Sequence, residues 1–204
     1  VLLRGLPHGQ TRPARRMSAL RTLVLVLGDQ LDAQASAFDG FDPAQDAVWM
    51  AEVAEESTHI VSGQPRIALF LSAMRHFAET LKQLSRPVHY TRLDDPDNRG
   101  SLATQLAHDL TRLQPRELVL TAPGDWRVLR ALQATAREAG LPLEIRDDRH
   151  FYTTVRDFAA HAQGRKSLRM EYFYREQRRR HGVLMDGGEP AGGRWNYDSE
   201  NRQS

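Results

Sequence analysis

Acidic and amide side chains follow the apolar segments of this chain. Gly28, Asp29 and Gln30 come directly after the first segment, and Glu52 and Glu56 come after the second. Further acids follow the later segments, at Asp94, Asp95, Asp125, Asp147 and Asp148. Carboxylates accept hydrogen bonds, and a glutamine amide both donates and accepts. The set would therefore suit an uncharged ligand that carries many hydroxyl groups and ring N–H donors.

Other kinds of site have less support. Phosphate groups are often held by glycine-rich loops, yet neither GxGxxG nor GxxxxGK[ST] is present. The acids lack the spacing of a recognised metal site, and the GxSxG motif of one class of hydrolase is absent. A structural role stays open for part of the set, because acids at helix starts stabilise the helix dipole.

The apolar segments are short and continuous, which is typical of strands buried on both faces of a parallel sheet. They cover residues 22–27, 47–51, 88–91, 117–121 and 143–145. Helical patterns lie between them. Residues 67–81 repeat apolar side chains at helical spacing, Ser101 can cap a second helix, and Asp125 can cap a third that begins with Trp126 and closes at Gly140.

This alternation predicts an α/β fold over residues 20–150: a doubly wound, Rossmann-like sheet of five parallel strands with helices on both faces. Ligands of open parallel sheets bind beyond the carboxyl ends of the strands. The predicted fold therefore brings the acidic and amide side chains to one rim.

The composition excludes cysteine-dependent sites within this chain and gives no sign of a membrane span. The 204 residues include no cysteine, so disulfides and thiolate ligands for zinc or iron–sulfur clusters are excluded within this chain. No apolar run approaches the ~18 residues of a membrane span, so we expect no membrane association and a cytoplasmic location.

Positive charge is concentrated in two segments. Residues 1–16 hold four arginines and no acid, and residues 164–182 hold seven basic residues against two acids. Since the whole chain carries +2, the remainder is acidic, at −7. Residues 1–19 are predicted to be a disordered extension, or to result from a translation start assigned too far upstream. An organelle-targeting segment and a nucleic-acid-binding arm are the alternatives.

Residues 151–204 are predicted to form a connector to a further domain. Ser167 can cap a helix that runs to about His181 and stops at Gly182, and residues 186–193 have the composition of a loop. Aromatic side chains on several faces of this helix predict burial by a neighbouring domain. Its arginines could pair with acids of that domain or hold the phosphates of a nucleic acid or dinucleotide. Alternatively, they form a solvated basic helix end, where positive charge is favoured by the helix dipole.

Three motifs carry a family resemblance. LVLVLGDQL at residues 23–31, IALFLSAMRHFAETL at 67–81 and GRKSLRMEYFYREQRRRHGVLMDG at 164–187, followed by GGRWNYDSENR, resemble the photolyase-related flavoproteins of the prokaryotic (6-4) photolyase branch. These are also described as iron–sulfur bacterial cryptochromes and photolyases. The resemblance extends over residues 20–203 and implies an amino-terminal antenna domain followed by an interdomain linker.

The resemblance also implies ligands. In the family the antenna domain binds 6,7-dimethyl-8-ribityllumazine at the strand ends, while FAD, the [4Fe–4S] cluster and most contacts to damaged DNA belong to a carboxyl-terminal domain that is missing here. The motif match assigns lumazine contacts to Gly28, Asp29, Gln30 and Glu56, with Ala51 and Glu52 in the pocket lining. The basic, histidine-containing stretch that usually precedes the SAMRHFA helix is replaced by SGQPR at residues 62–66, so no contact is carried over to that loop.

The resemblance therefore predicts the light-harvesting domain of a DNA repair flavoprotein, with no catalytic residue and no repair activity of its own. The alternative from the residues alone is a non-enzymatic module that binds a small ligand or a nucleic acid. A nucleotide-handling α/β enzyme is disfavoured because the phosphate-binding loops are absent.

Overall fold

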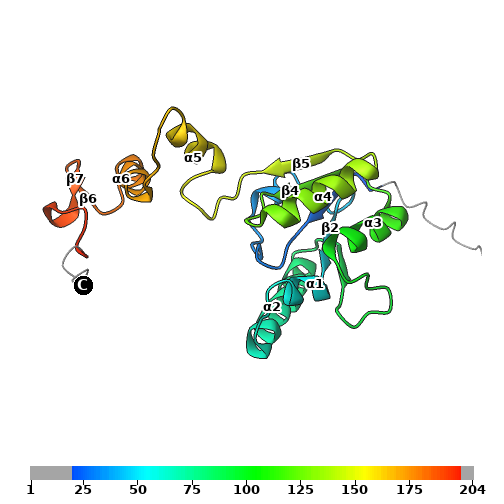
Figure 1. Cartoon of the computed structure of the whole chain (residues 1–204). Coiled ribbons are helices and arrows are strands. Elements are labelled where there is room, and N and C mark those ends of the chain that lie inside the picture. The colour runs from blue at the N-terminus through cyan, green and yellow to red at the C-terminus, as the bar shows by residue number, and fades with distance from the viewer. Residues whose placement is uncertain (1–19, 199–204) are drawn as a thin grey trace, which may run out of the picture.

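A computed structural model describes residues 20–198 of the chain (Figure 1). Its centre is a five-stranded parallel sheet with the strand order β3-β2-β1-β4-β5. The strands are β1 (Thr22–Leu25), β2 (Ala47–Ala51), β3 (Val88–Thr91), β4 (Glu117–Thr121) and β5 (Leu143–Arg146). The helices are α1 (Ala54–Thr58), α2 (Gln64–Gln83), α3 (Leu102–Leu113), α4 (Trp126–Glu138), α5 (Val155–Ala162) and α6 (Met170–His181).

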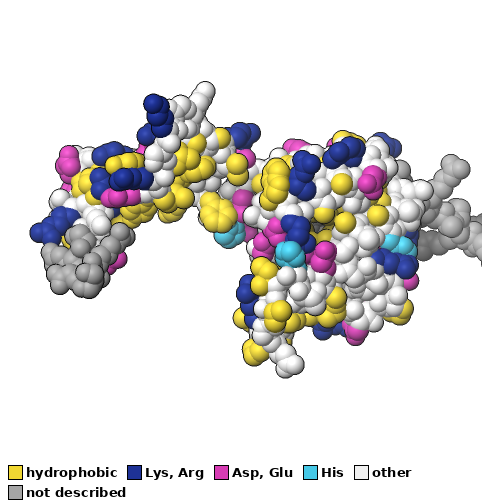
Figure 2. All heavy atoms as spheres, viewed as in Figure 1, with side chains coloured by type: hydrophobic (Ala, Val, Ile, Leu, Met, Phe, Trp, Pro, Cys, Tyr) yellow, Lys and Arg dark blue, Asp and Glu magenta, His cyan; other side chains and the backbone are white. Residues whose placement is uncertain are grey.

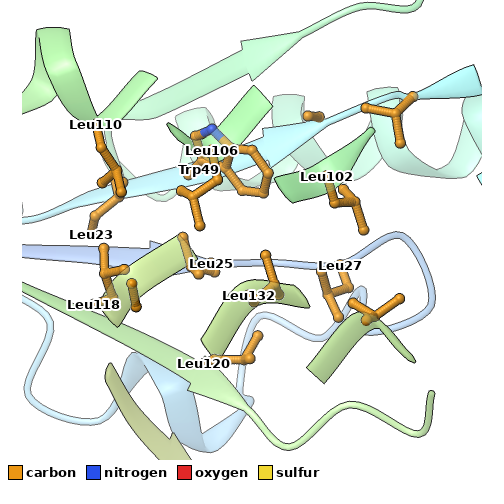
Figure 3. Packing of buried hydrophobic residues seen from close by; sticks show 14 of the residues in the cluster. Leu23, Leu25, Leu27, Trp49, Leu102, Leu106, Leu110, Leu118, Leu120 and Leu132 are labelled. Atoms are coloured by element: carbon orange, nitrogen blue, oxygen red, sulfur yellow. The ribbon is translucent and has the colours of Figure 1, made fainter. Parts of the chain in front are cut away.

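Both faces of the sheet are covered, because successive side chains of a strand point to opposite faces. Leu23 and Leu25 of β1 pack toward α3 and α4, together with Leu118 and Leu120 of β4 (Figure 3). Trp49 of β2 is fully buried in the same cluster. Val24, Val48 and Val119 form the opposite cluster with Met74, Phe77 and Leu81 of α2. The predicted doubly wound α/β fold is confirmed.

The predicted helix starts in the sheet domain are confirmed by their caps. The hydroxyl oxygen of Ser101 accepts a hydrogen bond from the backbone N–H of Thr104 at 3.2 Å, and a carboxylate oxygen of Asp125 accepts one from Arg127 N–H at 2.7 Å. Each satisfies one of the free N–H groups at the start of a helix. Trp126 is the first residue of α4 and is 69% exposed.

Two predictions for the connector are wrong. Helix α6 begins at Met170, after the capping position Arg169, and not directly after Ser167. Residues 186–193 are not only a loop: β6 (Met185–Asp186) pairs with β7 (Glu189–Pro190) in a short antiparallel hairpin, before a 3-10 turn η2 (Ala191–Gly193). Gly187 and Gly188 supply the two positive φ angles, 53° and 92°, that a two-residue hairpin turn requires.

Helices α5 and α6 pack against each other to one side of the sheet domain (Figure 1). The rings of Phe158 and Phe173 meet edge to face at 5.2 Å, and Nδ1 of His161 lies 2.6 Å from a carboxylate oxygen of Glu176. Other apolar side chains of this segment remain uncovered, and Met170 is 69% exposed. Figure 2 shows them as a hydrophobic surface beside arginines.

The prediction for residues 1–19 lies outside the described residues, as do the last residues of the linker motif. Within the part of the chain that the structure describes, every helix is too short or too polar to cross a membrane.

Candidate functional site

The main candidate site lies at the carboxyl ends of β1, β2 and β4. From β1 the chain adds β2 and β3 on one side of the sheet, and it then crosses over to add β4 and β5 on the other side of β1. The crevice between β1 and β4 is therefore the topological switch point of the sheet. A cavity of about 230 Å³ opens there. It is lined by the segments after β1 and β2, by α1 and the first half of α2, and by the starts of α3 and α4. We call it the switch-point cavity.

Five of the six predicted site residues line this cavity: Gly28, Asp29, Ala51, Glu52 and Glu56. They come from two neighbouring strand ends and from α1, which the parallel register of β1 and β2 brings together. Their contact with a ligand stays a prediction.

The sixth residue, Gln30, lies beside the cavity and ties the segment after β1 to the end of β4. Its side-chain N–H groups donate to the backbone oxygens of Ala122 at 2.9 Å and Thr121 at 3.3 Å. Among the described residues, the side-chain oxygens of Gln30 and Thr121 are buried without a hydrogen-bond partner.

Glu52 holds together the wall formed by β2, β3 and α2. Its buried carboxylate accepts hydrogen bonds from Arg75 at 2.6 and 2.8 Å, from the hydroxyl of Tyr90 at 2.6 Å and from Leu93 N–H at 2.9 Å. A carboxylate has about four acceptor positions, so none is left for a ligand. The guanidinium of Arg75 reaches back from α2 to this carboxylate, while 41% of its side chain stays exposed.

Burial alone would raise the pKa of Glu52, but the hydrogen bonds from Arg75, Tyr90 and Leu93 outweigh it and hold that pKa below its usual value. Burial and the hydrogen bond to Glu52 raise the pKa of the Tyr90 hydroxyl, which therefore stays protonated. The network is a fixed ion pair with no proton to exchange near neutral pH.

Asp29 and Glu56 are two acids of the cavity that remain able to accept from a ligand. Asp29 is exposed and has no hydrogen-bond or ion-pair partner within residues 20–198. Oε1 of Glu56 accepts from Nη2 of Arg127 at 2.8 Å, while Oε2 has no hydrogen-bond partner within the same residues. The cavity thus presents carboxylate acceptors beside apolar side chains of α2 such as Phe70 and Met74.

Sequence reasoning missed several residues of the cavity. Ser62 and Arg66 line it, although the loop at residues 62–66 departs from the family pattern. Arg127 at the first turn of α4 was not considered, because α1 and α4 are far apart in the sequence. No local pattern shows that a glutamate on a five-residue helix meets an arginine 71 positions later.

A second candidate surface lies on the connector. The guanidinium carbons of Arg175, Arg178 and Arg179 lie 5.4, 5.2 and 4.6 Å from the ring centre of Trp195, close enough for cation–π attraction. Arg175 pairs with Glu171, and Arg178 donates to the backbone oxygens of Val183 and Leu184. Arg179 has no ion-pair partner among the described residues, so part of this charge is uncompensated.

The fold and the site define an α/β domain with a cavity at the switch point of its sheet. The family model of the deoxyribodipyrimidine photo-lyase-related proteins matches residues 24–204. The chain therefore belongs to this family. A "(6-4) photolyase" of Agrobacterium fabrum is 46% identical over 181 residues, which cover 89% of this chain and 36% of that relative. The chain thus spans about a third of the relative that it matches.

Proposed function

We propose that this chain is the antenna domain of a (6-4) photolyase-like DNA repair flavoprotein and that its switch-point cavity binds 6,7-dimethyl-8-ribityllumazine. The observation that carries the proposal is the pairing of two available carboxylates, Asp29 and Glu56, with an apolar wall from α2 in one cavity. The ribityl hydroxyls can donate to the carboxylates, while the flat ring system packs on Phe70 and Met74.

The donor set of the cavity favours an uncharged, hydroxyl-rich ligand over a phosphorylated one. Acidic residues outnumber basic residues in the described lining. Arg66 is the one basic residue there, whereas Asp29, Glu56 and Asp125 are acidic in addition to Glu52. Fixed phosphate sites instead present several N–H donors and positive charge. A phosphate would therefore be repelled by the acids of this lining.

In the proposed whole protein, a bound lumazine absorbs near-UV or blue light and passes excitation to FAD, which supports light-driven electron transfer to pyrimidine photoproducts. FAD, a [4Fe–4S] cluster and damaged DNA would bind to a further domain. For the cluster this follows from the sequence, which has no cysteine to hold it. The uncovered apolar side chains of α6 support such a domain as a partner of the connector. We expect no light-dependent repair from this chain alone, even with added FAD.

A fluorescence titration with 6,7-dimethyl-8-ribityllumazine tests the proposal. We expect saturable binding that Glu56→Ala weakens by at least tenfold, because a hydrogen bond to a charged acceptor contributes about 1.5–3 kcal/mol. The folded state of each protein is checked by circular dichroism. Absence of binding by the folded wild-type chain would sink the antenna proposal.

The second candidate is a module that binds nucleic acid through the connector. The uncompensated Arg179 beside Trp195 favours it, since arginines bind phosphates and aromatic rings stack on bases. DNA affinity that falls steeply with salt and is lost in Arg179→Gln would support this candidate. Salt-independent or undetectable binding would remove it.

A further inference from the structure

Arg127 joins α1 to the start of α4, two elements that both line the switch-point cavity. Its Nη2 lies 2.8 Å from Oε1 of Glu56 and 3.3 Å from Oδ2 of Asp125, and its Nη1 lies 3.8 Å from Oε1 of Glu55. Glu55 and Glu56 belong to α1, whereas Arg127 and Asp125 belong to the start of α4. One guanidinium thus bridges two elements of the cavity lining.

Helix α1 has few other attachments. It has only five residues, none of them buried, and no side chain caps its start. Outside the helix, Glu55 N–H donates to the backbone oxygen of Gly100 at 3.0 Å. So short a helix is not stable by itself in water. The residue before the helix, Val53, is buried in the core and anchors its start. Within α1, the side chain of Glu56 is held by Arg127.

Arg127 itself is well anchored. Its backbone N–H donates to the capping carboxylate of Asp125 at 2.7 Å, and the next residue, Val128, is buried in the core between α3, α4 and the sheet. The hydrogen bond that Arg127 donates to Glu56 is the largest cause that raises the pKa of Arg127, so its charge persists at every accessible pH. The fixed partner of the pair is the arginine, and the positioned partner is the glutamate.

We propose that Arg127 is a positioning residue for ligand binding: it holds Oε1 of Glu56 and directs Oε2 to a ring N–H or hydroxyl of the ligand. Glu56 lines the cavity, and Oε2 has no hydrogen-bond partner in residues 20–198. A planar guanidinium that bridges two carboxylates fixes their direction, which a lysine cannot do equally well. The inference rests on the proposed ribityl-lumazine ligand. It adds Arg127 as the residue that orients Glu56 toward that ligand.

The test measures lumazine affinity by fluorescence in the full chain and in four variants: Glu56→Gln, Arg127→Met, Arg127→Lys and the double variant Glu56→Gln/Arg127→Met. We expect Arg127→Met to weaken binding about tenfold, or about 1.4 kcal/mol. Arg127→Lys should recover part of this loss, because lysine restores the positive charge but lacks the planar guanidinium that binds two carboxylates. Arg130→Met is the matched control, since Arg130 lies one turn further along α4 and has no carboxylate partner in the described part of the chain.

The double variant separates positioning from general stabilisation. If Arg127 acts through Glu56, then Arg127→Met costs less than twofold once Glu56 is glutamine, because coupled residues are not additive. A full tenfold loss in that background, or wild-type affinity in Arg127→Met, overturns the proposal. Equal melting temperatures of Arg127→Met and Arg130→Met rule out a loss of folded protein.

Amide hydrogen exchange without ligand distinguishes this inference from the proposed function. Exchange at residues 55–58 should be severalfold faster in Arg127→Met than in Arg130→Met, because α1 loses its link to α4. If wild-type protein binds no lumazine, the ligand assignment falls with the proposed function, and faster exchange still supports the link between Arg127 and α1. Unchanged exchange overturns that link as well.

Discussion

The ring of Phe70 occupies the space that a side chain on Gly28 would need. A Cβ atom on Gly28 would lie 2.7 Å from Cζ of Phe70 and 2.8 Å from Sδ of Met74. The φ angle of Gly28 is not in the left-handed region, so the glycine is required for space and not for backbone conformation. This contact brings α2 onto the end of β1 and forms one wall of the switch-point cavity.

Gly28→Ala should therefore destabilise the domain through overpacking. We expect the free energy of unfolding to fall by about 1–3 kcal/mol, measured by urea denaturation. Adding Phe70→Ala should restore much of that loss, because the ring is what the new methyl group meets. Gly124→Ala is the control, since a Cβ atom on Gly124 would meet no other atom within 4 Å. A loss in Gly28→Ala that Phe70→Ala leaves unchanged would argue against this packing.

Glu52 should contribute to stability in a pH-dependent way. The pKa of this carboxyl group is lowered in the folded state, so its contribution is fully present above its unfolded pKa of about 4.3 and is lost as pH falls below that value. Glu52→Gln should lower the free energy of unfolding by about 2 kcal/mol at pH 7, because it breaks a buried ion pair with a half-exposed arginine.

Urea denaturation at pH 7, 5, 4 and 3 measures both effects of Glu52→Gln. Between pH 5 and pH 3 the variant should lose less stability than the wild type, since it has no carboxylate to protonate at this position. Glu138→Gln, an exposed change at the end of α4, should stay within about 0.5 kcal/mol of the wild type. Parallel pH curves for Glu52→Gln and wild type would contradict the assignment.

Asp29 should behave in the opposite way to Glu52. Because its carboxylate is exposed and has no partner within residues 20–198, Asp29→Asn should leave the melting temperature unchanged. Lumazine affinity should fall about tenfold, the effect of losing one charged acceptor of about 1.5 kcal/mol. Asp97→Asn, an exposed acid outside the cavity, is the control for a general charge effect. Equal affinities in the two variants would remove Asp29 from the proposed site.

The sheet domain could be predicted from the sequence because its signals are local. The run at residues 22–27 and the capping residues Ser101 and Asp125 each mark an element within a few positions. The connector was harder to predict. Helix α5 was missed, although Thr154 and Asp157 form a capping box at its start, because only eight residues follow.

The candidate site could be located from the sequence, but its internal roles could not. Strand ends predict where Asp29, Glu52 and Glu56 meet, since the parallel sheet brings them to one edge. Which of them is available to a ligand depends on Arg75, Tyr90 and Arg127, whose contacts span 23, 38 and 71 positions. Such long-range pairing leaves no trace in a local pattern.

The division between sheet domain and connector leads to a prediction about truncation. Every residue that lines the switch-point cavity precedes position 129, whereas α5 and α6 contact mainly each other. A chain that ends at His150 keeps the hydrogen bond from Ser36 to the backbone of Asp147 at 2.6 Å, which secures the segment after β5. We therefore expect residues 17–150 to fold cooperatively and to bind lumazine within about twofold of the full chain. Thermal unfolding and the fluorescence titration, run side by side on both proteins, measure this. A truncated chain that folds but has lost binding would show that the connector contributes to the site.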